Sequence, residues 1–109
     1  MIDHRLIDER SLAFSRLIAC KLRADPALAQ RAGGNLERWL RDCSERSRPA
    51  LLEWQALLAG PLDELLSVLA SPEERAVRLR QSNPFAGLLT PNERWAILRD
   101  FQNRDATAA

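Results

Sequence analysis

A long stretch of helical periodicity near the start of the chain constrains the fold more than any other feature of the sequence. Residues 2–23 contain no proline or glycine, and their apolar side chains recur at intervals of three, four or seven. The residues with this spacing are Leu6, Ile7, Phe14, Leu17, Ile18 and Leu22. The alternating apolar pattern of a strand occurs nowhere in the 109 residues. We therefore predict an all-α fold that begins with a long amphipathic helix.

Proline, glycine and capping residues divide the next part of the chain into shorter helices. Asp25 followed by Pro26 is a typical N-cap and first helical position, so a short helix is expected there. Gly33 and Gly34 are predicted to end that helix in a turn. Asn35 is then placed to cap a third helix.

The second half of the chain contains further helix boundaries. Pro49 predicts the start of a helix that Gly60 and Pro61 end, and a Leu-rich helix is expected over residues 62–70. Two capping-box patterns, S/T-x-x-E, predict that further helices begin after Ser71 and after Thr90.

These boundaries predict six or seven short-to-medium helices in a compact irregular or orthogonal bundle. Residues 1–103 are expected to form a single helical domain. Residues 104–109 have no large apolar side chain to bury, so a disordered tail is expected there.

The sequence offers little for catalysis or for binding a metal or cofactor. It contains one histidine, His4, and two cysteines, Cys20 and Cys43, which do not form a CxxC pair. The glycine-rich phosphate and dinucleotide motifs and the H-E-x-x-H zinc motif are missing. We therefore expect no enzymatic activity, no cofactor and no metal site.

Charge and hydropathy make a membrane protein unexpected. The formal net charge is +1, and the two signs interleave along the chain instead of forming a basic or an acidic tail. No apolar run approaches the ~20 residues that a membrane span requires, and the N-terminus lacks the pattern of a secretory signal. A cytoplasmic protein is therefore expected. Lys21 is the only lysine beside fifteen arginines.

Residues 62–81 have roughly the proportions of a helix-turn-helix unit. The polar residues of its second helix that could reach DNA are Arg75, Arg78, Arg80 and Gln81. However, Glu73 and Glu74 occupy the N-terminal positions that normally face DNA, where their charges would repel phosphate. DNA binding is therefore kept as the alternative function.

The loop expected over residues 82–89 combines a residue restricted by proline with apolar side chains and a glycine. Each aromatic side chain taken alone is expected to pack in the core, but this loop with Phe85 is the segment most expected to be exposed. Tryptophan and arginine are favoured anchors at protein interfaces. The candidate contacts for a protein partner are Arg80, Pro84, Phe85, Leu88, Arg94 and Trp95.

Residues 79–95, which read LRQSNPFAGLLTPNERW, resemble a signature of short bacterial proteins of unassigned function. The resemblance covers only this part of the chain, and a Trp-containing helix ahead of a Leu-rich one adds to it. Some of these proteins resemble the antitoxins of two-gene cassettes. The resemblance implies a protein that neutralises or positions another protein, and it supplies no catalytic residues.

The sequence thus favours a non-enzymatic protein-interaction module, antitoxin-like in the sense of that resemblance. The alternative is a small helix-turn-helix regulator that binds DNA, and one protein can combine both functions. A homodimer is a third expectation, because the apolar stripe of the first helix would pair with a second copy if the rest of the chain left it uncovered.

Overall fold

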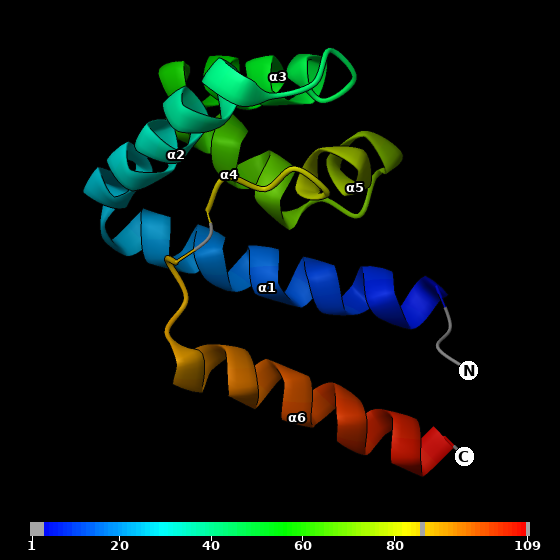
Figure 1. Cartoon of the computed structure of the whole chain (residues 1–109). Coiled ribbons are helices and arrows are strands. Elements are labelled where there is room, and N and C mark those ends of the chain that lie inside the picture. The colour runs from blue at the N-terminus through cyan, green and yellow to red at the C-terminus, as the bar shows by residue number, and fades with distance from the viewer. Residues whose placement is uncertain (1–3, 86, 109) are drawn as a thin grey trace.

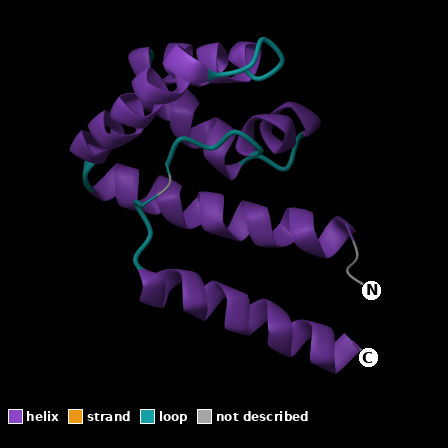
Figure 2. Cartoon of the chain, viewed as in Figure 1, coloured by secondary structure: helices purple, strands orange, loops and turns teal. Residues whose placement is uncertain are grey.

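The computed structural model describes residues 4–85 and 87–108, and over those residues its regular secondary structure is all helical, with loops and turns between the helices (Figures 1 and 2). The helices are α1 (His4–Ala24), a 3-10 turn η1 (Pro26–Leu28), α2 (Ala29–Asp42), α3 (Arg48–Ala59), α4 (Leu62–Ala70), α5 (Glu74–Arg80) and α6 (Pro91–Ala108). The prediction of an all-α fold with six or seven helices is confirmed. No described helix combines the length and the hydropathy needed to cross a bilayer.

Helix α1 is the central element of the arrangement. It packs against α4 and α5 on one side and against α6 on the other (Figure 1). Helices α2 and α3 pack on each other, and α3 also contacts α4 and α5. Helix α6 returns alongside α1 in the opposite direction (Figure 1). The apolar stripe of α1 is therefore largely covered within the chain: Ile18 and Leu22 are buried, and Phe14 and Leu17 pack against the core.

Trp54 of α3 lies at the centre of the core and is fully buried. Its indole nitrogen donates a 2.8 Å hydrogen bond to the backbone carbonyl of Leu79 in α5, so the polar edge of the ring is satisfied. The ring of Phe85 meets Trp54 edge-on, with centroids 5.6 Å apart and an interplanar angle of 80°. This contact brings the loop between α5 and α6 into the core.

The predicted turn at Gly33 and Gly34 is wrong, because both residues lie inside the continuous helix α2. Ala32 and Leu36, on either side of the pair, are buried, so packing holds this segment helical despite two residues of low propensity. Asn35 consequently caps no helix. The side chain of Asp25 makes no capping hydrogen bond either, and the residues after it form the 3-10 turn that leads into α2.

One of the two predicted capping boxes is confirmed. The Thr90 hydroxyl oxygen accepts a hydrogen bond from the Glu93 amide at 3.1 Å, and the Glu93 carboxylate accepts one from the Thr90 amide at 2.8 Å. The box at Ser71 is wrong, because α5 begins at Glu74 and Glu73 is its N-cap. The Ser71 hydroxyl instead accepts the Glu73 amide at 3.1 Å, within the turn that ends α4.

The last helix is longer than the sequence indicated. Phe101 is buried, and the backbone remains helical beyond it to Ala108. The helix thus runs through most of the segment in which a disordered tail was expected. Residue 109 lies outside the described residues.

Candidate functional site

The loop between α5 and α6, residues 81–90, lies in the middle of the predicted contact surface from Arg80 to Trp95, and the structure buries four of its apolar side chains. Phe85 is 2% exposed, and Pro84 and Leu88 are also buried. The expectation that Phe85 is exposed is therefore wrong. The physical reason is the edge-on contact with Trp54, because packing against that ring removes the apolar ring of Phe85 from water.

Polar contacts at the start of the loop hold Phe85 in this position. The Asn83 side-chain oxygen accepts the Phe85 amide at 2.7 Å, which is an Asx turn. The Asn35 amide group donates to the Pro84 carbonyl at 2.8 Å and ties the loop to α2. Sequence reasoning missed both asparagines as loop-positioning residues. The Asn83-Pro84 pair was a local signal for the first, whereas no local signal indicated the second.

Lys21 fixes the other end of the loop. Its ammonium group, on α1, donates to the Leu88 carbonyl at 2.6 Å and to the Glu93 carboxylate at 2.7 Å. These bonds join α1, the loop and the first turn of α6. The hydrogen bond from Lys21, followed by that from the Thr90 amide, lowers the pKa of Glu93. Lys21 was conspicuous as the only lysine, but the sequence did not indicate its partners.

Arg80 was a candidate for both partner binding and DNA binding, and it is 7% exposed. Its guanidinium donates to the Ser71 carbonyl at 2.7 Å and to the Val68 carbonyl at 3.4 Å. These carbonyls lie at the C-terminal end of α4, where a positive charge is favourable. Burial lowers the pKa of Arg80, and the nearby Asp8 carboxylate partly opposes that effect. The arrangement gives Arg80 a structural role in joining α4 to α5.

The four residues predicted to bind DNA do not form a common basic face. Helix α5 is only 7 residues long. Arg75 and Gln81 are exposed, whereas Arg80 is buried. The guanidinium of Arg78 pairs with Glu53 of α3 at 3.1 Å, so its charge is partly neutralised. A recognition helix needs several exposed donors on one side, and this segment offers few.

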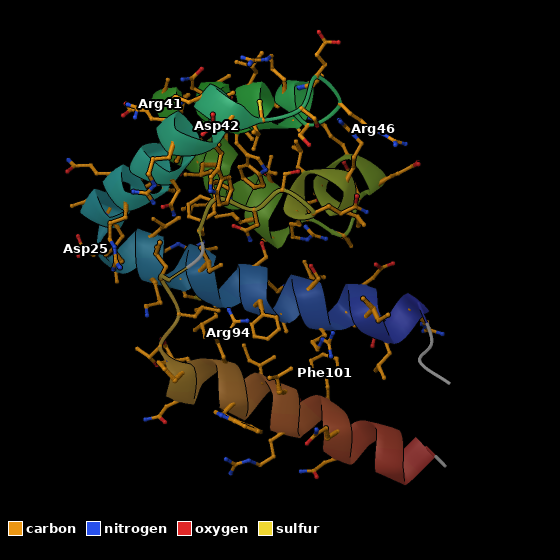
Figure 3. The ribbon with its side chains drawn as sticks, in the orientation of Figure 1. Asp25, Arg41, Asp42, Arg46, Arg94 and Phe101 are labelled. Atoms are coloured by element: carbon orange, nitrogen blue, oxygen red, sulfur yellow. The ribbon has the colours of Figure 1, made fainter. Side chains whose placement is uncertain are left out.

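The remaining two candidates, Arg94 and Trp95, lie on α6. The Arg94 guanidinium sits over the Phe14 ring of α1, 5.5 Å from the ring centroid, and Figure 3 shows Arg94 and Phe101 between the two helices. Trp95 is 58% exposed, although it is the largest kind of apolar side chain. Of the six predicted partner contacts, these two are therefore the accessible ones.

The described residues contain no group of three or more histidine, cysteine or acidic side chains placed to hold a metal ion. Cys20 is exposed and Cys43 is half-buried, and both are free thiols. Comparison of the chain with protein-family models, with curated proteins and with solved structures finds no match.

Proposed function

We propose that this protein is a helical protein-interaction module whose contact surface is the outer face of α6 around Trp95. The observation that carries the proposal is the exposure of Trp95, which leaves 58% of an indole-bearing side chain in water. A tryptophan side chain buries roughly 150–250 Å² when it is covered, so a partner that covers this one would gain on the order of 2–3 kcal/mol.

The geometry of α6 separates this face from the contact with α1. At about 100° per residue, Trp95 lies about 160° around the helix from Ile97 and about 120° from the buried Phe101. Ile97 and Phe101 both line the groove between α6 and α1. The side of α6 that carries Trp95 is thus directed away from the rest of the chain.

Charge indicates the chemistry of the partner. Arg99 stands one helical turn after Trp95 and is exposed, and Asn92 and Gln102 lie on the same side of the helix. Tryptophan and arginine are the residues most enriched at interface hot spots. We infer a protein partner with an apolar pocket for the indole and a carboxylate at its rim for Arg99.

The resemblance of residues 79–95 to short bacterial proteins, some of them antitoxin-like, supports the same class of function. In that case the partner is a second bacterial protein that this chain neutralises or positions. The helix-turn-helix alternative has less support, because Arg80 is buried and Arg78 is paired with Glu53.

The test is a tagged pull-down from host lysate, with and without nuclease, carried out with the wild-type protein and with Trp95→Ala. A hot-spot tryptophan contributes about 2 kcal/mol or more, so the variant should retain roughly 30-fold less of the specific partner at limiting concentration. Leu52→Ala is the matched control, since Leu52 is also a large exposed apolar residue (46%) but lies on α3. Its capture should equal that of the wild type.

Three results would contradict the proposal. Equal capture by wild type and Trp95→Ala would show that Trp95 is not the anchor. Capture that disappears with nuclease would favour DNA binding. A doubled mass in light scattering that returns to the monomer mass with Trp95→Ala would show that a second copy occupies the surface.

A further inference from the structure

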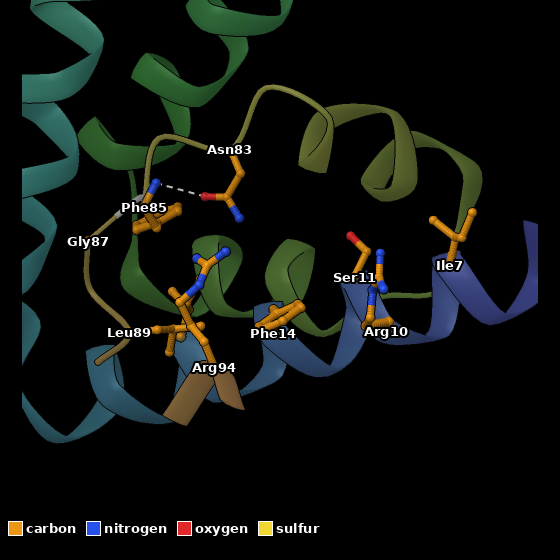
Figure 4. A pocket seen from close by; sticks show the side chains of 10 residues that line it. Ile7, Arg10, Ser11, Phe14, Asn83, Phe85, Gly87, Leu89 and Arg94 are labelled. Atoms are coloured by element: carbon orange, nitrogen blue, oxygen red, sulfur yellow. Dashed lines mark hydrogen bonds between the residues drawn. The ribbon is translucent and has the colours of Figure 1, made fainter. Parts of the chain in front are cut away.

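A cavity of about 290 Å³ lies where α1, the loop between α5 and α6, and α6 meet (Figure 4). Polar side chains line it together with apolar ones. Its walls include the rings of Phe14 and Phe85 and the side chain of Leu89. The space corresponds to about ten liquid waters, which suits a small organic molecule. The proposed contact surface at Trp95 is not part of it.

The charged side chains that line this cavity are both arginines, Arg10 from α1 and Arg94 from α6. Among the described residues, no carboxylate lines it. Neither arginine forms an ion pair within the described part of the chain, and the neighbouring Glu93 is bonded to Lys21. Two guanidinium groups beside aromatic walls create a positive potential in a space partly shielded from water, where it acts more strongly than on an open surface.

Asn83 adds a neutral donor to the same space. Its side-chain oxygen is occupied by the Phe85 amide at 2.7 Å, so its nitrogen is the end left for a ligand, as Figure 4 shows. The Ser11 hydroxyl, from α1, also lines the cavity. The groups that converge here are thus predominantly hydrogen-bond donors, and three separate segments of the chain supply them.

We propose that this cavity binds a small organic acid. Its carboxylate lies against Arg94, since a guanidinium fork matches a carboxylate geometrically, and Arg10 adds a second positive charge on the other side of Phe14 (Figure 4). The apolar body of the acid packs against Phe14, which is half-buried, and the Asn83 nitrogen donates to a carboxylate oxygen. Phe85 packs against Trp54 and its amide donates a hydrogen bond to Asn83, so the loop that carries Asn83 is positioned before the ligand arrives.

The test uses phenylacetate as the probe and NMR titration of the ¹⁵N-labelled protein as the readout. Phenylacetate matches the cavity in size and combines one carboxylate with one aromatic ring. We expect saturable shifts for the amides of residues 83–89 and for those around Arg10, with a dissociation constant in about the micromolar-to-millimolar range. Phenylacetamide, the neutral analogue, and acetate, which lacks the ring, should each bind at least about tenfold more weakly.

Two variants locate the site independently. Arg94→Met should weaken phenylacetate binding by at least about tenfold, because it removes a charge-assisted hydrogen bond. Arg10→Met should weaken it by a smaller factor, because it removes a nearby positive charge. Arg99→Met is the matched control, since it removes an exposed arginine from α6 outside the cavity, and its affinity should stay within about twofold of the wild type. Circular dichroism establishes that each variant is folded.

The proposal is overturned if phenylacetate produces no saturable shifts up to about 10 mM. It is also overturned if phenylacetamide binds as tightly as phenylacetate, or if both Arg10→Met and Arg94→Met retain wild-type affinity. Trp95→Ala should leave phenylacetate binding unchanged, so a failure of the proposed protein-binding function and a failure of this site are distinguishable.

Discussion

Replacing Gly33 or Gly34 with alanine should stabilise the protein, because both glycines lie in the interior of α2. Neither has a positive φ angle, so an alanine can adopt the same backbone conformation. Outside the adjoining backbone of α2, a Cβ atom built at either position meets no atom within 4 Å, so the added methyl group has room. The change therefore acts mainly by restricting the unfolded chain, which glycine leaves unusually free.

The expected gain is about 0.5–1 kcal/mol for each substitution. The entropy of unfolding is about 2.1 cal/mol/K per residue, so for a chain of 109 residues it is roughly 0.23 kcal/mol/K. Each alanine should then raise Tm by about 2–4 °C. The double variant should show roughly the sum.

Thermal unfolding followed by circular dichroism at 222 nm, together with urea denaturation, measures the effect. Gly87→Ala is the control with the opposite sign. Gly87 has a φ of 89°, which an alanine rarely adopts. Gly87→Ala should therefore lower the free energy of unfolding by about 1–2 kcal/mol, even though the added Cβ would have space. A lower Tm for both Gly33→Ala and Gly34→Ala would refute the reasoning, because it would mean that the glycine pair forms a turn in the folded protein.

Other changes test the contacts around α6. Thr90→Ala should lower the free energy of unfolding by about 1 kcal/mol, whereas Ser71→Ala should change it by less than about 0.5 kcal/mol, since only Thr90 completes a capping box. Equal losses in urea denaturation would contradict this. The lowered pKa of Glu93 stabilises the folded state above the ordinary value of 4.5, and this contribution is lost as the pH falls through the folded-state pKa. Glu93→Gln should therefore lose less stability than the wild type between neutral and strongly acidic pH, while Glu45→Gln, at an exposed position, should follow the wild type. Parallel pH profiles for Glu93→Gln and the wild type would disprove the assignment.

The sequence predicted the helices that begin or end with an unambiguous local signal. Helix α4 was placed at residues 62–70, and the Thr90 capping box was identified because both partners of the box lie within one helical turn. The turn predicted at Gly33 and Gly34 was wrong because helix propensity is a local quantity. The burial of Ala32 and Leu36 depends instead on α2 packing against the rest of the protein.

The candidate site was harder to predict than the fold for a related reason. Whether Phe85 lies in the core depends on Trp54, 31 residues earlier, and no local pattern reports that contact. Arg80 looked like an exposed cation, but it serves as a donor to the end of the preceding helix. Trp95 was one of the predicted partner contacts, and its exposure could be seen only once α6 was placed against α1.

The bonds of Lys21 have a practical consequence for any binding measurement on this protein. Lys21 carries the only side-chain amine in the chain, and its side chain is 25% exposed. Reagents that acylate amines would therefore modify the group that connects α1 to Leu88 and Glu93. Acylation removes its charge and with it the ion pair to Glu93. Immobilisation through a biotinylated tag or through the exposed Cys20 thiol would leave this connection intact.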